Sequence, residues 1–194
     1  MYKKQMKAQK IICLAAIIIS AAVFIYSLGI MTDLYDTLYS TMRNPSDHLK
    51  TDVTGSIVYY NMQDFNSAFL KASIVLLLLG VLLFITNTNI RRRYYIGNYI
   101  SVGLYAAASA VLSVWAHSQI EIYKAQFLQV DFEALREHAD MWGTAYTEST
   151  FWFDIHYAVF GLLLLAAAAL VANAIWKTML MKEEKALIGQ GKEI

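Results

Sequence analysis

The sequence predicts an all-α integral membrane protein with four transmembrane helices, and two observations lead to this fold class. The first is composition: 58% of the 194 residues are hydrophobic and only 16% are charged, whereas soluble domains average about 45–50% and 25%. A soluble domain of this length cannot bury so much apolar surface in one core. The second is that the uncharged residues gather in four long stretches. The excess apolar surface is therefore expected to face lipid.

Each of these stretches is long enough to cross a bilayer as a helix. Residues 11–32, 72–90, 94–120 and 155–176 contain no Asp, Glu, Lys or Arg. A helix needs about 20 residues to cross roughly 30 Å of hydrocarbon, and its backbone must be hydrogen-bonded internally there. With flanking interfacial residues included, the predicted spans are about 11–32, 69–90, 94–119 and 151–176. The chain is expected to form a single membrane domain, 1–194.

The first span could be mistaken for a signal peptide, because lysines precede it. Its uncharged run of 22 residues is longer than the roughly 7–15 apolar residues of a signal peptide. We therefore expect it to be retained as a membrane helix.

The charges predict which side each segment occupies. The segment before the first span, the turn 91–93 and the tail after residue 176 together carry eleven basic and three acidic side chains. Segments 33–71 and 121–154 carry five basic and twelve acidic ones. Because basic residues are enriched on the cytoplasmic side, both termini and the arginine turn are expected there. The result is two hairpins with an N-in, C-in topology.

The two long outer loops, about 33–68 and 120–150, are expected to pack together as a small extracytoplasmic cap. Apolar residues at helical spacing predict that the first helix continues through residues 31–44, up to Pro45. β-Branched and aromatic residues in 51–62 predict a short strand or hairpin. Residues 122–135 predict an amphipathic helix. Aromatic residues crowd the outer ends of the spans, where rings favour the headgroup level.

Small residues indicate which helices pack closely, since they let membrane helices approach one another. The first span has Ala16 and Ser20 four residues apart, and the third and fourth spans have several such pairs. The second span has only Gly80 within its apolar core. We therefore expect the first, third and fourth spans to pack closely. The second is expected to be peripheral, or to be covered by another protein chain.

The third span also carries a polar stripe at steps of three or four residues. Its members are Asn98, Ser101, Tyr105, Ser109, Ser113 and His117. Two interpretations stay open: hydrogen bonds to neighbouring helices, or a wet groove that binds a small molecule. Asn98 and Asn173 lie about one turn from the inner ends of their spans. They are expected to meet as a structural pair of amides.

Ionisable residues gather at the outer ends of the helices, where they are candidates for a site. They are Asp33, Asp36, Lys71, His117, Asp154 and His156. One interpretation is interfacial salt bridges, such as Lys71 with Asp154 or Asp33. Another is a transition-metal site on His117, His156 and Asp154, with His138 and Asp140 as replacement ligands. A third is a b-type haem held between the two span-end histidines.

Catalytic chemistry has no visible basis in the sequence, and no enzyme activity is expected. There is no Gly-x-Ser-x-Gly, phosphate-binding loop or zinc-protease motif. The single cysteine, Cys13, lies in an apolar segment and is expected to be inert packing. The net charge of +1 and the lack of a long basic run argue against a nucleic-acid partner.

These observations predict a non-catalytic membrane subunit. It would bind and stabilise or regulate a larger membrane assembly, such as a transporter complex, through its outer loops and helix faces. Its partners are expected to be the lipid bilayer and other membrane subunits or further copies of the chain. The alternatives are a redox or metal-binding membrane protein and a small-molecule carrier or sensor. The lack of glycosylation acceptor sites and of loop cysteines indicates a bacterial cytoplasmic membrane.

Overall fold

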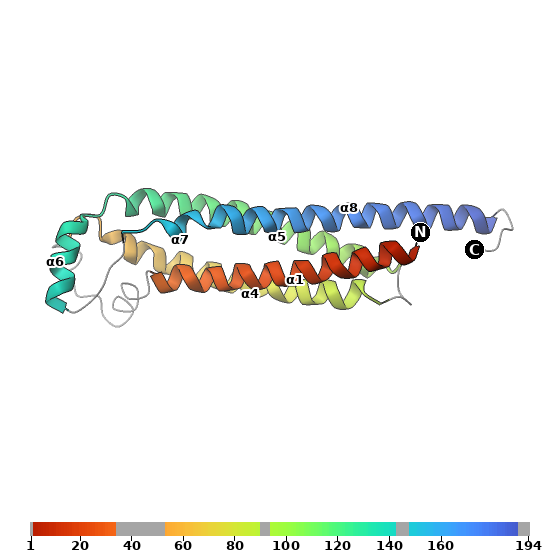
Figure 1. The fold of residues 1–194 in the computed structure, drawn as a ribbon, viewed down its shortest axis with the longest axis horizontal. Helices are drawn as coiled ribbons and strands as arrows, with labels where there is room; N and C mark the ends of the chain where they lie inside the picture. The colour runs from red at the N-terminus through yellow and green to blue at the C-terminus, as the bar shows by residue number, and fades with distance from the viewer. Residues whose placement is uncertain (1, 34–52, 90–93, 143–147, 190–194) are drawn as a thin grey trace. The chain divides into compact units, whose positions relative to one another are not determined.

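A computed structural model describes residues 2–33, 53–89, 94–142 and 148–189. Within these ranges the regular structure is entirely helical, as the sequence predicts (Figure 1). The helices are α1 (Tyr2–Asp33), α4 (Ile57–Asn87), α5 (Ile96–Phe127), α6 (Phe132–Trp142), α7 (Phe151–Asp154) and α8 (His156–Gly189). Helices α1, α4, α5 and α8 supply the four segments that are long and apolar enough to cross a membrane. The predicted fold class is confirmed at this level.

All four long helices have more residues than the predicted spans, and two of them extend into the predicted outer loops. Helix α4 begins at Ile57 and α5 continues to Phe127, so parts of both predicted outer loops are helical. The predicted strand or hairpin within 51–62 is wrong for the described residues, which form a turn and then the start of α4. The buried apolar side chains of this segment follow a helical spacing: Val58, Tyr59, Met62, Phe65 and Phe69. The helix predicted over 31–44 lies outside the described residues beyond Asp33.

Contacts between residues divide the chain into two compact units, and each takes a portion of all four long helices. The first unit contains Met1–Ala22, Ile74–Ser113 and Phe160–Ile194. The second unit contains Val23–Ser73 and Val114–Val159. Each unit has its own buried residues and its own candidate site, and each is described separately below.

In the first unit one close helix contact involves α4, which the sequence predicts to be peripheral. A Cβ atom on Gly80 would lie 3.3 Å from Ser20 Oγ, 3.6 Å from the Tyr105 ring and 3.7 Å from Ile17 Cα. Gly103 and Gly161 are exposed, and a Cβ on either would meet nothing within 4 Å. Gly80 therefore brings α4 close to α1 and α5 at one point, which the small number of such residues in its span does not predict. The number of small residues in a span does not reveal which of them face a neighbouring helix.

The second unit has an aromatic core. The Phe65 ring lies 5.6 Å from Phe69, 5.5 Å from Trp115 and 5.6 Å from Tyr123, measured between ring centroids. These distances are typical of favourable aromatic pairs, which add about 0.5–1.5 kcal/mol each beyond their burial. Phe65 and Phe69 are also buried. These two rings therefore pack inside the unit.

A second aromatic cluster surrounds Phe127 at the end of α5. Its ring centroid lies 6.3 Å from Tyr59, 5.2 Å from Phe132 and 5.0 Å from Phe153. Phe127 thus joins α5 to α4, α6 and α7.

A turn at Gly55 packs against another non-helical segment of the second unit. Gly55 has φ 81°, a left-handed conformation that side chains disfavour. The turn packs against the segment that follows α5: Asp131 N–H donates to Thr54 O at 3.0 Å. A Cβ on Gly55 would lie 2.7 Å from Gln129 O and 2.9 Å from Val130 Cα. Both the backbone angle and the close approach require glycine here.

Replacing Gly55 with alanine is expected to lower the free energy of unfolding by about 1–3 kcal/mol, because it combines backbone strain with a steric overlap. Thermal unfolding of the purified protein in detergent measures the change. Gly103→Ala is the matched control, since its added methyl group enters open space. Equal melting temperatures for the two variants would contradict this account of the turn.

Candidate metal site and polar pocket

Two histidines from different helices meet in the second unit. His117 lies on α5 and His156 is the first residue of α8. His117 Nδ1 lies 2.8 Å from His156 Nε2, within hydrogen-bonding distance. His156 is buried, whereas His117 is exposed. The pair can therefore be reached from outside the unit through His117.

The chain before α8 orients His156. The short helix α7 ends at Asp154, and the His156 ring turns back so that Nδ1 donates a hydrogen bond to the carbonyl of Phe153. A carbonyl oxygen can only accept, so Nδ1 carries the proton. In the neutral ring, Nε2 then presents a lone pair toward His117. Metal-binding histidines are commonly oriented in this way by a hydrogen bond at the other ring nitrogen.

Glu121 completes a group of three ligand atoms. It follows His117 by four residues on α5, which places both side chains on one helix face. Glu121 Oε1 lies 3.7 Å from His156 Nε2 and accepts a hydrogen bond of 2.7 Å from the Tyr157 hydroxyl. One ligand atom from each of His117, Glu121 and His156 lies within 4.8 Å of the others. Two imidazoles and one carboxylate form a donor set that transition metals bind.

Asp154, the carboxylate that the sequence assigns to the metal, makes different contacts. It forms an ion pair with Lys124 and accepts a hydrogen bond from Thr150 at 2.8 Å. The two-residue separation of 154 and 156 accounts for this, since such neighbours point in different directions on a helix. The pairing predicted between Lys71 and Asp154 is likewise not the one formed. Lys71 is exposed on α4.

The other predicted ionisable residues cannot be placed in this site. Asp36 lies outside the described residues, and the side chain of Asp33, at the end of α1, does so too. The side chains of His138 and Asp140, on α6, are also outside the described set. The residue that sequence reasoning missed is Glu121. Its spacing of four from His117 is the signal that could have identified it.

The polar stripe on α5 lies in the first unit except for His117, which is exposed and belongs to the second unit. Its members Asn98, Ser101, Tyr105, Ser109 and Ser113 are all buried. The Tyr105 hydroxyl lies 2.8 Å from Ser20 Oγ and 3.0 Å from the Ala16 carbonyl oxygen of α1. Ser101 Oγ accepts a hydrogen bond of 2.8 Å from the Asn87 amide of α4. These contacts join α5 to α1 and α4 and favour the interhelical interpretation for Tyr105 and Ser101. The buried Ser113 hydroxyl has no hydrogen-bond partner among the described residues.

Asn173 belongs to a larger network of amides, which reaches the Asn98 backbone oxygen through the Asn87 amide at 3.4 Å. Gln5 Nε2 donates to Gln9 Oε1 at 2.7 Å and to Asn173 Oδ1 at 3.3 Å, and Gln9 Nε2 donates to the Asn87 backbone oxygen at 2.5 Å. These bonds connect α8, α1 and α4. The sequence analysis missed Gln5, Gln9 and Asn87, because it considered amides only within the third and fourth spans.

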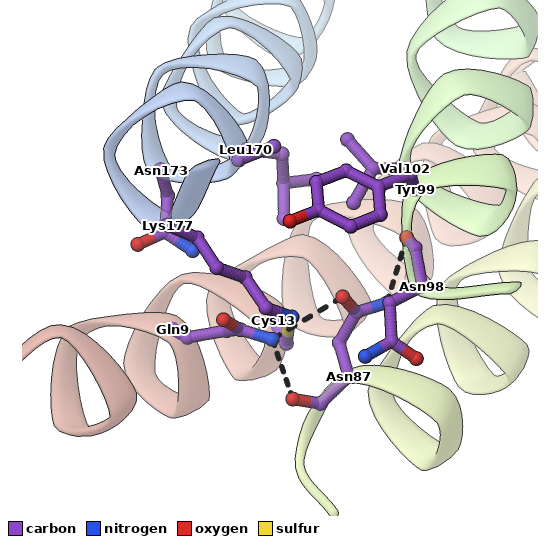
Figure 2. Close-up of a pocket in the computed structure, with 10 residues that line it drawn as sticks. Gln9, Cys13, Asn87, Asn98, Tyr99, Val102, Leu170, Asn173 and Lys177 are labelled. Atoms are coloured by element: carbon purple, nitrogen blue, oxygen red, sulfur yellow. Dashed lines mark hydrogen bonds between the residues drawn. The ribbon is translucent and has the colours of Figure 1, made fainter. Parts of the chain in front are cut away.

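A small pocket lies beside this network, and Figure 2 shows the side chains around it. The lining residues come from all four long helices: Gln9, Cys13, Asn87, Asn98, Tyr99, Val102, Leu170, Asn173, Ala174 and Lys177. Cys13 is fully buried, in agreement with the packing role that the sequence predicts. Lys177 is buried as well, although the sequence places it in the charged tail after the fourth span.

Comparisons with protein-family models, with curated proteins and with solved structures find no match. The function therefore has to be inferred from the chain's own residues.

Tyr105→Phe is expected to lower the free energy of unfolding by about 0.6–1.7 kcal/mol, the range measured for hydrogen bonds between membrane helices. The change removes the hydroxyl that contacts Ser20 and Ala16 while it keeps the buried ring. Chemical or thermal unfolding in detergent measures it. Ser118→Ala serves as the control, because this exposed hydroxyl bonds only within α5. A Tyr105→Phe variant as stable as the parent would contradict the interpretation that the stripe forms interhelical hydrogen bonds.

Proposed function

We propose that this chain is an integral membrane protein that binds a divalent transition-metal ion through His117, Glu121 and His156. The observation that carries the proposal is the convergence of three ligand atoms, from two helices, within 4.8 Å of one another. Placing two imidazoles and a carboxylate side by side costs desolvation free energy. Close approach of two imidazoles and a carboxylate gives each of them little stabilisation unless a proton or a cation lies between them.

Only small movements separate the observed geometry from a coordinated ion. Ligand nitrogens about 2.0–2.1 Å from a tetrahedral zinc ion lie roughly 3.3 Å from each other. The histidine nitrogens, now 2.8 Å apart, would have to separate by a few tenths of an ångström. The proton on His117 Nδ1 would move to its other ring nitrogen, which leaves both imidazoles neutral as ligands.

Neighbouring hydrogen bonds support the same assignment. His156 donates to the Phe153 carbonyl and Glu121 accepts from Tyr157. Such outer contacts fix the orientation of metal ligands and raise affinity by about 10–100-fold in known sites. Three protein ligands leave one position of a tetrahedral ion open to water or to another molecule. A site of this kind suits a metal sensor or carrier as well as a fixed structural ion.

The b-type haem hypothesis fits this geometry less well. Axial nitrogens on opposite sides of a haem iron would be separated by roughly twice a metal–nitrogen bond of about 2.0 Å. The two imidazoles instead contact each other directly, and the Tyr157 ring lies 4.1 Å from the His156 ring between centroids. We therefore favour a metal ion without a porphyrin.

We also propose the membrane orientation that the charges indicate. Both termini and turn 91–93 would face the cytoplasm of a bacterial cell, and the two long connections would form a cap on the opposite side. The contact between Thr54 and Asp131 is consistent with such a cap. The accessory-subunit hypothesis stays a prediction. It depends largely on loop residues 34–52 and 143–147, which lie outside the described ranges.

Glu121→Gln is expected to weaken zinc binding by about 100-fold or more, because it removes the anionic ligand. Titration calorimetry on chelator-stripped protein in detergent, with Zn²⁺ as the probe, measures the affinity. The matched control is Asp154→Asn, which changes the carboxylate paired with Lys124 and should leave zinc binding nearly unchanged. Absence of stoichiometric zinc in the parent protein would refute the proposal. So would an Asp154→Asn variant that loses binding while Glu121→Gln retains it.

Orientation can be tested by thiol labelling in a Cys13→Ser background. Glu133→Cys on α6 and Lys185→Cys on α8 both replace exposed side chains. A membrane-impermeant maleimide applied to intact cells is expected to label the first variant strongly. It should label the second only after the membrane is permeabilised. The reverse pattern would show that the charge rule assigns the wrong side.

A further inference from the structure

Lys177 is the most unusual buried residue in the first unit. Its side chain on α8 is only 3% exposed, and its Nζ has no hydrogen-bond partner among the described residues. Its Nζ lies 5.5 Å from the centroid of the Tyr99 ring. A buried ammonium group without a counter-ion is strongly destabilising, so such lysines usually have a partner. Figure 2 shows the side chain reaching from α8 toward Cys13 on α1.

The groups around Lys177 are rich in hydrogen-bond donors. The Tyr99 hydroxyl is buried without a partner among the described residues and can donate a proton. The side-chain oxygens of Asn173 and Gln9 already accept hydrogen bonds from Gln5. The Asn173 side-chain nitrogen makes no hydrogen bond to described residues, and it too is a donor. None of the described lining residues is acidic.

The size of the pocket limits what can bind. Its free volume is about 10 Å³, which is room for roughly one water-sized particle. A monatomic anion fits this space, whereas a tetrahedral phosphate or sulfate does not. A water molecule would fit as well, but it would not compensate the charge of the ammonium group.

We propose that this pocket binds a small monovalent anion of about the size of chloride. The anion would contact Lys177 Nζ and accept hydrogen bonds from the Tyr99 hydroxyl and the Asn173 amide. It would bridge α5 and α8 and supply the counter-charge that the protein's described residues lack. This site lies in the first unit and uses none of the proposed metal ligands.

The test uses chloride as the probe and the purified full chain in an uncharged detergent. Thermal unfolding is followed while sodium gluconate is replaced by sodium chloride at constant ionic strength. Saturating chloride is expected to raise the unfolding temperature by about 3 °C or more, as binding to the folded state alone requires. Lys177→Met should abolish this dependence. Lys182→Met, which removes an exposed lysine of the same helix, should retain it.

A direct measurement covers the case in which Lys177→Met does not fold. Chloride-35 NMR line broadening by the parent protein, reversed by bromide, reports binding without any variant. Unfolding temperatures that do not depend on chloride, together with unbroadened chloride lines, would overturn the proposal. So would stabilisation by inorganic phosphate but not by chloride, since that result would indicate an oxyanion or lipid headgroup. An unchanged chloride effect in Lys177→Met would place the anion elsewhere.

Discussion

A polar side chain buried between long helices is stabilised by a partner on a neighbouring helix, and contacts of this kind connect the helices within each unit. Within a helix the backbone groups are already paired, and lipid offers no water to the side chains. Tyr105 therefore reaches Ser20 and Ala16 on α1, and Gln9 reaches Asn87 on α4. In the second unit His117 reaches His156 on α8. The same contacts set which helix faces meet.

This constraint explains which features could be predicted from the sequence. The four long helices follow from composition, since nothing but lipid can accommodate so many apolar residues. The start of α4 does not follow, because Asp64 and Lys71 interrupt the uncharged residues although the helix continues through both. A window free of charge identifies the membrane-embedded part of a helix, and the helix itself extends past it. The same limit placed Gln5, Gln9 and Lys177 outside the predicted bundle.

The candidate site shows that a residue's depth along the helix axis and the direction of its side chain are separate pieces of information. Antiparallel helices bring residues at their ends to a similar depth, which is how the sequence links His117 with His156. Depth alone cannot choose between Asp154 and Glu121, because both lie near the same helix ends. Direction decides: Glu121 shares a face with His117 at a spacing of four, while Asp154 turns toward Lys124. Gly80 illustrates the same point, as its contacts depend on its face rather than on the small residues in its span.

The two proposed sites differ in how many hydrogen bonds their side chains already make to the protein without a bound ion. His156 has partners at both ring nitrogens, and Glu121 is hydrogen-bonded by Tyr157. A metal ion must therefore displace an existing hydrogen bond, and part of its binding free energy is used in doing so. Lys177 and the Tyr99 hydroxyl make no such bonds to described residues. An anion there would displace no hydrogen bond between described residues, so its binding free energy would appear almost fully as stabilisation of the fold. Binding at the histidines would instead act mainly on the geometry of α5 and α8 around the metal.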